Sequence, residues 1–140
     1  MNVIVDTSAW SLAFRRKSRK QVNAGERRVL DDLVELLRER RGKMLGIVRQ
    51  ELLSGIRDEL QLQRLRERLR TFPDIDLQTA DYEEAASLWN KCRRVGIVAS
   101  LTDFLICAVA IRRQYAILTT DKDFGRFAKI LPIRLHQPRG

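Results

Sequence analysis

The chain has 140 residues, of which 44% are hydrophobic, and its 27 Lys and Arg against 18 Asp and Glu give a formal net charge of +9. This hydrophobic content, with only 7 Gly and 3 Pro, excludes an extended disordered protein and is typical of a single domain spanning residues 1–140. The sequence pI near 10.4 indicates a polyanionic partner such as nucleic acid. Acidic proteins and membrane surfaces also attract basic chains, so the charge alone does not decide between them.

The cysteines and the apolar segments indicate where the protein resides. Cys92 and Cys107 are too few for a disulfide scaffold and lack CxxC spacing, which favours a reduced protein. Met1–Val5 is too short for the core of a signal peptide. The apolar run Phe104–Ile111 is far below the roughly 20 residues that cross a bilayer. We therefore expect a soluble, cytoplasmic protein with no membrane contact.

The first half of the chain alternates short apolar runs with amphipathic segments. Gly42 is expected to end the longest amphipathic segment, because glycine is common just beyond a helix. After the first predicted helix, Arg15–Lys20 places five positive charges in six residues. The predicted elements are a strand at Val3–Val5, helices at Ser8–Phe14 and Glu26–Arg41, a strand at Met44–Ile47, and helices at Val48–Leu53 and Glu59–Arg70.

The second half continues this alternation. Leu101–Ile111 is apolar almost all round, which predicts a buried helix that starts at Ser100. The other predicted elements are a strand at Ile75–Leu77, a helix from Thr79 to Arg94 with Thr79 as its cap, a strand at Ala116–Leu118, a helix at Asp121–Ile130 and a strand at Ile133–Leu135. Strands and helices in this order predict an α/β fold, in which helices flank a central, mainly parallel sheet.

Four acidic residues stand where one predicted element gives way to the next: Asp6, Glu51, Asp103 and Asp121. Asp6 and Asp121 follow predicted buried strands, and ligand sites in open α/β sheets form outside the carboxyl ends of the strands. Hard dications prefer oxygen ligands such as carboxylates. These acids, on a basic chain, therefore predict a divalent-metal site that acts on a polyanion.

Each acid also has a purely structural interpretation. Asp6 and Asp121 could cap the helices that follow them. Ser100-x-x-Asp103 has the form of a capping box, and Glu51 could lie on a solvated helix face. Capping needs only a neutral acceptor, however, which Ser, Thr and Asn also supply. Carboxylates gathered in one place raise one another's pKa values at a cost in stability, and a bound Mg²⁺ or Mn²⁺ removes that cost.

Four motifs in chain order match a known family. They are Val3-Ile4-Val5-Asp6-Thr7-Ser8, Glu51-Leu52-Leu53-Ser54-Gly55, Asp103 before Leu105-Ile106-Cys107-Ala108, and Thr119 with Asp121, Asp123 and Phe124. With these motifs the chain resembles the PIN-domain nucleases, and among them the VapC-like toxins of bacterial and archaeal toxin–antitoxin pairs, from Val3 to about Leu135. Phe104 and Cys107 depart from the family, which more often has Ala at both positions.

The resemblance implies a PIN-like fold and a metal-dependent endoribonuclease. Such an enzyme hydrolyses RNA phosphodiester bonds and, as a toxin, inhibits translation or growth. By this resemblance Asp6 and Asp103 supply oxygens to Mg²⁺ or Mn²⁺, and Asp121 is a further catalytic acid. Glu51 is the fourth catalytic residue, either as a ligand or by orienting the attacking water.

Supporting residues and partners are also expected. Thr119 and Asp123 would position the loop around the acids through hydrogen bonds. The basic run could contact RNA phosphates through Arg15, Arg16, Lys17, Arg19 and Lys20. The resemblance further implies a VapB-like antitoxin that covers the acidic cleft, and a homodimer. The mixed apolar and basic helices Glu26–Arg41 and Glu59–Arg70 are candidates for those contacts.

Two alternatives to a toxin stay open. One is a PIN-type nuclease of RNA processing, and the other is a noncatalytic RNA-binding module whose carboxylates only cap helices. His136 is the only histidine, so ribonuclease chemistry based on a pair of histidines is excluded, and we expect His136 at the surface. Trp10 and Trp89 are expected to pack on helix core faces rather than to stack on bases.

Overall fold

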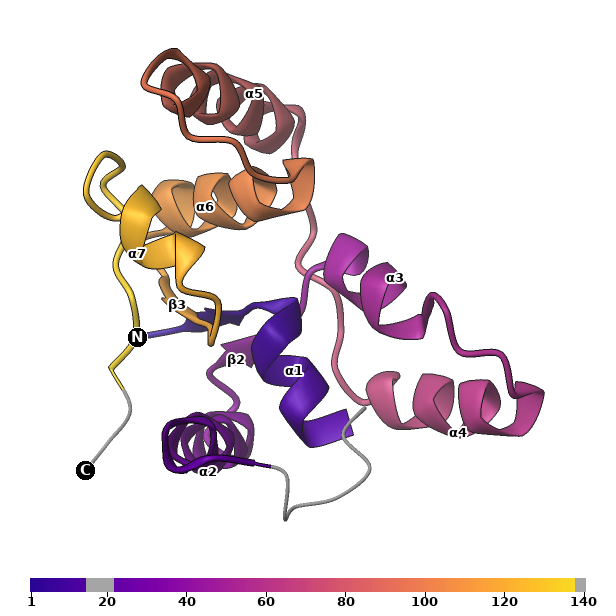
Figure 1. Ribbon diagram of the computed structural model, residues 1–140. Helices are drawn as coiled ribbons and strands as arrows, with labels where there is room; N and C mark the ends of the chain where they lie inside the picture. Colours follow the sequence, from indigo (N-terminus) through magenta and orange to yellow (C-terminus); the bar gives the residue numbers. More distant parts are fainter. Residues whose placement is uncertain (15–21, 138–140) are drawn as a thin grey trace.

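A parallel sheet forms the centre of the computed structural model, which describes residues 1–14 and 22–137 (Figure 1). Within these residues β1 (Val3–Val5) lies between β2 (Gly42–Lys43) and β3 (Ala116–Leu118), and both neighbours run parallel to it. β1 and β3 are apolar and buried throughout, as expected for parallel strands that helices cover on both faces. The predicted α/β fold with a parallel sheet is confirmed.

The helices surround this sheet. Their bounds are α1 Thr7–Phe14, α2 Ala24–Arg38, α3 Gly46–Leu53, α4 Glu59–Leu69, α5 Thr79–Arg94, α6 Leu101–Arg113 and α7 Asp123–Phe127. In the view of Figure 1, α5, α6 and α7 lie above the sheet and α2 lies below it. α1 contacts both α2 and α3, and α3 continues into α4 as an arm on the right of that view. In that view β1 runs from left to right, so its carboxyl end lies on the side of this arm.

The predicted strand at Met44–Ile47 is wrong. β2 ends at Lys43, Leu45 is an extended residue that precedes a helix, and α3 already begins at Gly46. Met44 itself makes only a single parallel bridge, to Asp74. The apolar run thus spans the end of one element and the start of the next. A run this short cannot distinguish a strand from the start of a helix by its periodicity.

Two further predicted strands, Ile75–Leu77 and Ile133–Leu135, are not formed as strands. In the C-terminal segment, Leu135 makes one parallel bridge with Ile117. The Ile117 N–H donates to the Arg134 carbonyl at 2.9 Å, and the His136 N–H donates to the Ile117 carbonyl at 2.8 Å. The segment 134–136 therefore lies along the outer edge of β3 without extending into a strand.

Side-chain caps decide where two of the helices begin. Asn23 accepts a hydrogen bond from the Glu26 N–H at 2.8 Å, and the Glu26 carboxylate accepts one from the Asn23 N–H at 3.2 Å. This reciprocal cap starts α2 at Ala24, before the predicted Glu26. At α5 the residue before the helix is Gln78, so the predicted cap at Thr79 is wrong by one position.

A buried ion cluster joins α5 to α6. Asp81 is fully buried, and its carboxylate accepts hydrogen bonds from Arg112 Nε at 2.9 Å and from two Arg113 nitrogens at 2.7 and 3.1 Å. The Gln78 N–H adds another at 2.8 Å. These contacts, that of Arg113 above all, hold the pKa of Asp81 well below its usual range. The cluster ties the first turn of α5 to the last turn of α6, whose other end carries Asp103.

The hydrophobic core lies against both faces of the sheet. Its largest fully buried side chains include Trp10, Phe104, Phe124 and Phe127, so Trp10 packs in the core as predicted. His136 differs from the prediction: its side chain is only 14% exposed and pairs with the buried carboxylate of Asp32 on α2. Within the described ranges, no helix is long and apolar enough to cross a membrane.

Candidate active site

Asp6 lies at the carboxyl end of β1, next to the end of β3. Its backbone N–H donates to the Leu118 carbonyl at 2.9 Å, so the two strands end side by side. The Asp6 side chain is buried, with 5% of the residue exposed. Thr119 follows β3 directly and contacts Asp6 across a sequence separation of 113 residues. The parallel pairing thus brings the loop after β3 to the first predicted acid.

The carboxylate of Asp6 is held through one of its two oxygens. Ser8 Oγ donates to Oδ2 at 2.7 Å, and Thr119 Oγ1 donates to the same oxygen at 2.8 Å. The Ser8 N–H makes a longer contact with Oδ2 at 3.4 Å. Burial raises the pKa of Asp6, while the hydrogen bonds from Ser8 and Thr119 counteract the rise because they stabilise the ionised form. Asp6 is therefore a desolvated carboxylate supported by two hydroxyls.

Asp103 lies in the first turn of α6. Its N–H donates to Ser100 Oγ at 3.1 Å, so the hydroxyl of Ser100 is the cap of this helix. The pKa of the half-buried Asp103 is raised to about 6, mainly by burial, and the negative charges of Asp6 and Asp121 raise it further. A hydrogen bond with Ser100 acts in the opposite direction. Asp6 and Asp121 are thus near enough for their charges to act on Asp103.

Glu51 reaches the same region from α3. Its Oε1 accepts a hydrogen bond from the Thr7 hydroxyl at 2.6 Å, and Thr7 directly follows Asp6. Glu51 is partly buried. A residue whose side chain simply faced solvent on the surface of a helix would not need a contact with a residue 44 positions away in the sequence. The structure therefore links Glu51 to the strand-end acids through Thr7.

Asp121 and Asp123 occupy the loop after β3 and the start of α7. The Asp121 N–H donates to Thr119 Oγ1 at 2.9 Å, and Asp121 Oδ1 accepts the Asp123 N–H at 2.9 Å. α7 accordingly begins at Asp123, not at the predicted Asp121, and is shorter than expected. The Asp123 carboxylate pairs with Arg126 at 3.5 Å on the surface. Asp123 thus contacts the loop through its backbone N–H, while its carboxylate faces Arg126 at the surface.

The fit of this site to a metal ion rests on its chemistry. In the described part of the chain, no three His, Cys, Asp or Glu side chains are placed to hold a metal ion together. The donors are nevertheless those that hard dications prefer, carboxylate oxygens. A dication between them would offset the repulsion from Asp6 and Asp121 that raises the pKa of Asp103. The residues therefore fit Mg²⁺ or Mn²⁺ in kind.

The two departures from the family pattern lie beneath the acids. Phe104 is 1% exposed and packs on Phe127, with 5.2 Å between ring centroids, so it points into the core and not into the site. Cys107 is also buried. Burial, with a smaller effect from the charge of Asp103, raises the pKa of its thiol. Neither side chain replaces an oxygen donor.

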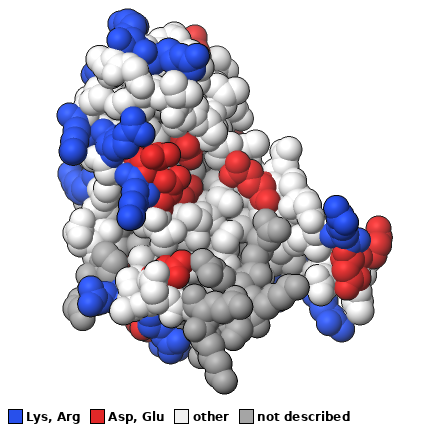
Figure 2. All heavy atoms as spheres, viewed as in Figure 1, with Lys and Arg blue, Asp and Glu red and all other residues white. Residues whose placement is uncertain are grey.

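Opposite charges meet on the face of the molecule shown in Figure 2. Figure 2 shows acidic side chains gathered near the middle of that face with basic side chains beside them. Lys122 and Arg126 are exposed and flank Asp123 in sequence. The predicted RNA contacts lie outside the described residues: Arg15, Arg16, Lys17, Arg19 and Lys20.

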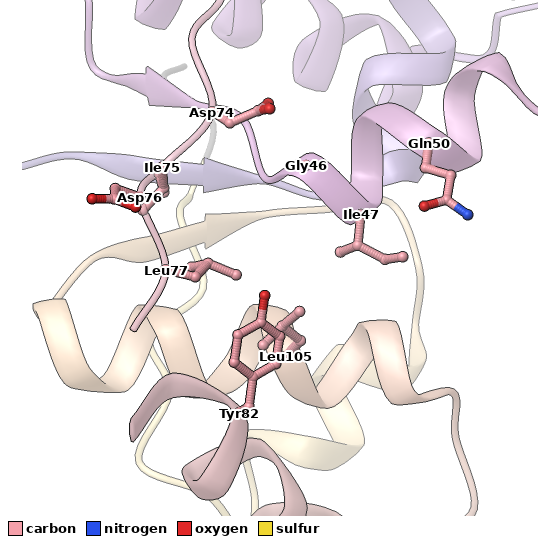
Figure 3. Close-up of a pocket in the computed structure, with 9 residues that line it drawn as sticks. All are labelled: Gly46, Ile47, Gln50, Asp74, Ile75, Asp76, Leu77, Tyr82 and Leu105. Carbon is pink, nitrogen blue, oxygen red and sulfur yellow. The ribbon is translucent and has the colours of Figure 1, made fainter. Parts of the chain in front are cut away.

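A separate pocket of about 510 Å³ lies between α3 and the helices α5 and α6 (Figure 3). Figure 3 shows the Tyr82 hydroxyl directed toward the middle of the pocket, below Leu77 and Ile47. An apolar pocket of about 330 Å³ shares Ile47, Tyr82 and Leu105 with it. None of the four predicted catalytic acids lines either pocket. The acids at the strand ends, and not these pockets, therefore form the candidate active site.

Sequence reasoning missed the roles of Thr7 and Ser8. Both were part of the first motif, yet only Asp6 was singled out as a candidate from it. Their contacts with Glu51, Asp6 and the loop after β3 depend on how distant segments pack. The available signal was two consecutive hydroxyl side chains at the start of a helix, directly after a strand-end acid.

Comparisons with known proteins agree with the fold. The family model described as PIN domain matches residues 3–130. Ribonuclease VapC11 of Mycobacterium tuberculosis is 33% identical over 131 residues, which cover 91% of this chain and 92% of the relative. The solved structure of FitAcB from Neisseria gonorrhoeae has a TM-score of 0.73 at 18% identity, covering 97% of both chains. A toxin–antitoxin complex from Klebsiella pneumoniae has a TM-score of 0.60 at 19% identity, covering 86% of this chain and 88% of the other.

Proposed function

The chain belongs to the PIN-domain family, and from this membership we propose that it is an endoribonuclease that hydrolyses RNA phosphodiester bonds with a divalent cation. One observation carries the proposal: the hydroxyl of Thr119 joins Asp6 at the end of β1 to the loop that carries Asp121, and Thr7 beside Asp6 binds Glu51 of α3. A protein that used these acids only as helix caps would have no reason to gather them. The relative described above, which is named a ribonuclease, supports the same activity.

Asp6 and Asp103 would hold the cation, Mg²⁺ or Mn²⁺, with Asp121 beside them. When bound, such an ion lowers the pKa of a coordinated water and neutralises charge at the phosphoryl group. The chain's own residues prepare this site. Asp103, with a pKa of about 6, is ionised at neutral pH. Glu51, held by Thr7 through Oε1, can orient the attacking water with its other oxygen.

RNA approaches this site against the negative charge of its carboxylates. Basic side chains beside the acids would neutralise the flanking phosphates and make binding sensitive to salt. The net charge of +9 supports such a role, and Lys122 and Arg126 are exposed close to Asp121 in sequence. The basic run from Arg15 to Lys20 stays a prediction, since it lies outside the described residues.

We further propose that the protein is the toxin of a toxin–antitoxin pair. A solved relative in fold is described as a toxin–antitoxin complex. A VapB-like antitoxin would neutralise the protein by covering the acids at the strand ends. A homodimer and a cytoplasmic location stay predictions. A PIN-type nuclease of RNA processing is the alternative, and a neighbouring antitoxin gene would decide against it.

The test replaces Asp6 or Asp103 by Asn in the purified protein. Asn keeps the shape of the side chain and loses the charge, so the variants should stay folded while metal-dependent RNA cleavage falls by about 100-fold or more. Asp31→Asn is the matched control, because the Asp31 side chain is 70% exposed and its ion pair in the described part of the chain is with Arg27 along α2, at 3.5 Å. Normal cleavage by both Asp6→Asn and Asp103→Asn would show that these acids do not carry the reaction. A native chain that binds RNA without cleaving it would leave the noncatalytic RNA-binding module as the better explanation.

A further inference from the structure

The first two residues of α1 use their hydroxyl groups outside their own helix. Ser and Thr at a helix start usually bond to backbone groups of the same turn. Here Thr7 Oγ1 bonds to Glu51, 44 residues away, and Ser8 Oγ accepts the Thr120 N–H, 112 residues away. Both hydroxyls lie directly after Asp6 in the sequence. They connect the segment carrying Asp6 to two other parts of the site.

Ser8 connects Asp6 to the loop after β3. Ser8 Oγ donates its single proton to Asp6 Oδ2 at 2.7 Å and accepts the Thr120 N–H at 3.0 Å. Thr119 Oγ1 repeats this pattern: it donates to the same Oδ2 at 2.8 Å and accepts the Asp121 N–H at 2.9 Å. Two backbone N–H groups of the loop are thus joined to one carboxylate oxygen through two hydroxyls. Asp6 Oδ1 takes part in neither connection.

Thr7 fixes the acid that comes from the arm formed by α3 and α4. Its hydroxyl donates to Glu51 Oε1 at 2.6 Å, so one carboxylate oxygen is oriented and Oε2 is left for another partner. Without this bond the Glu51 side chain, which is only partly buried, could rotate into solvent and away from the other negative charges. The bond thus keeps Glu51 beside the segment that carries Asp6.

We propose that Thr7 and Ser8 are positioning residues that together hold Glu51, Asp6 and the loop 119–121 in one arrangement before metal or RNA binds. We call this pair of hydroxyl residues the hydroxyl clamp. Groups that are fixed during folding need not be ordered during binding or catalysis, which lowers the cost of both. The purpose of the clamp rests on the proposed nuclease function, whereas its hydrogen bonds are a property of the folded chain alone.

The first experiment tests the clamp without metal or RNA. Amide hydrogen exchange of Thr120 and Asp121 is measured by NMR in the native chain, in Ser8→Ala and in Ser8→Thr. Loss of the Ser8 hydroxyl should speed exchange at Thr120 by about tenfold. Asp121 should change less, because its N–H is bonded to Thr119 and not to Ser8. Ser8→Thr should restore the native rate, and an unchanged Thr120 rate in Ser8→Ala would refute the Ser8 half of the clamp.

The second experiment tests what Thr7 does for the site. Thr7→Val removes the hydroxyl and keeps the side-chain shape, and Thr7→Ser puts a hydroxyl back. Thr7→Val should weaken Mn²⁺ binding, measured by calorimetry, and lower kcat for RNA cleavage, each by about 10- to 100-fold, with KM for RNA nearly unchanged. Thr7→Ser should recover both. A lower thermal midpoint with native Mn²⁺ affinity and native kcat would mean that Thr7 only stabilises the fold, and the Thr7 half of the proposal would be wrong.

The two proposals fail in different ways. If the native chain does not cleave RNA with Mg²⁺ or Mn²⁺, the nuclease function fails, while the exchange rates of Thr120 still report on the clamp. If Asp6→Asn is inactive but Thr7→Val and Ser8→Ala keep native metal affinity, native kcat and native exchange rates, the nuclease function holds and the clamp does not exist.

Discussion

At the scale of single residues, Asp103 carries the clearest electrostatic cost in the site. Its pKa is raised to about 6 from the ordinary 3.8, first by burial and then by the charges of Asp6 and Asp121. Because the folded state binds this proton more tightly than the unfolded state, the contribution of Asp103 to stability is fully present below pH 3.8 and is lost as pH rises through about 6. At neutral pH the ionised carboxylate therefore opposes folding.

Asp103→Asn should consequently make the protein more stable at pH 7.5. Asp103 is only half-buried, so solvent screening reduces the gain to on the order of 1 kcal/mol, or a few degrees in thermal midpoint. Thermal unfolding of the native chain and the variant measures it, and the difference should shrink toward zero near pH 4, where the native carboxyl is protonated. A variant that is less stable at pH 7.5 would show that Asp103 serves the fold and not the chemistry.

The sequence predicted individual acids better than their contacts. Asp6 and Asp121 could be placed because each follows an apolar strand, and parallel strands end together. The contact between Thr7 and Glu51 could not be predicted, since it depends on how α1 packs against α3. His136 was wrongly expected at the surface, because its partner Asp32 lies 104 residues away on another element.

At the scale of elements, the pair α5 and α6 depends on the buried carboxylate of Asp81. Arg112 and Arg113 reach it from the last turn of α6 with side chains that are 34% and 20% exposed, so both can also contact water. The carboxylate has no such alternative because it is fully buried. The cluster holds the last turn of α6 against α5, at the end of the helix opposite Asp103.

Asp81→Asn should destabilise the protein by about 2–3 kcal/mol, since it removes the charge that two buried or half-buried guanidinium groups share. Urea unfolding measures this change. Asp76→Asn is a suitable control, because the hydrogen bond that Arg113 donates to Asp76 goes to the backbone carbonyl, at 3.1 Å, and the substitution keeps it. RNA cleavage per folded molecule should stay close to native, and a loss of cleavage without a loss of stability would contradict the structural role of Asp81.

Element types were easier to predict than element bounds. The helices at Thr7–Phe14, Glu59–Leu69 and Leu101–Arg113 match their predictions within one residue at most ends, because each has a cap or a long apolar face. The strand predicted at Met44–Ile47 failed because one apolar run feeds both β2 and α3. Asp121–Ile130 was predicted too long because the Asp121 side chain bonds the Asp123 N–H, which places Asp121 before the helix.

At the scale of the whole molecule, the PIN fold and its parallel sheet were predicted from motif order and from alternating elements, and both are confirmed. The placement of the acids around one site follows from that topology. The distances between the acids could not be predicted from the sequence. In the described residues the side chains do not form a three-ligand metal site. Those distances depend on side-chain rotamers and on the ion itself.

Added Mn²⁺ should therefore raise the thermal midpoint of the native chain. A ligand at a hundredfold excess over its Kd stabilises a folded protein by about 2.7 kcal/mol, equivalent to several degrees here. Calorimetric scans with and without Mn²⁺ measure the shift, with chelator-treated protein as the reference. Asp6→Asn should lose most of the shift, and an equal shift in native chain and variant would place the ion somewhere other than at the strand ends.

The segment 134–136 also has a protective effect on the sheet. Its two backbone hydrogen bonds to Ile117 occupy peptide groups that β3 would otherwise present to another chain, and the pairing of His136 with Asp32 anchors it. Exposed strand edges are templates for intermolecular pairing and aggregation. The segment 134–136 thus covers this edge of the sheet and prevents strands of neighbouring molecules from pairing with it.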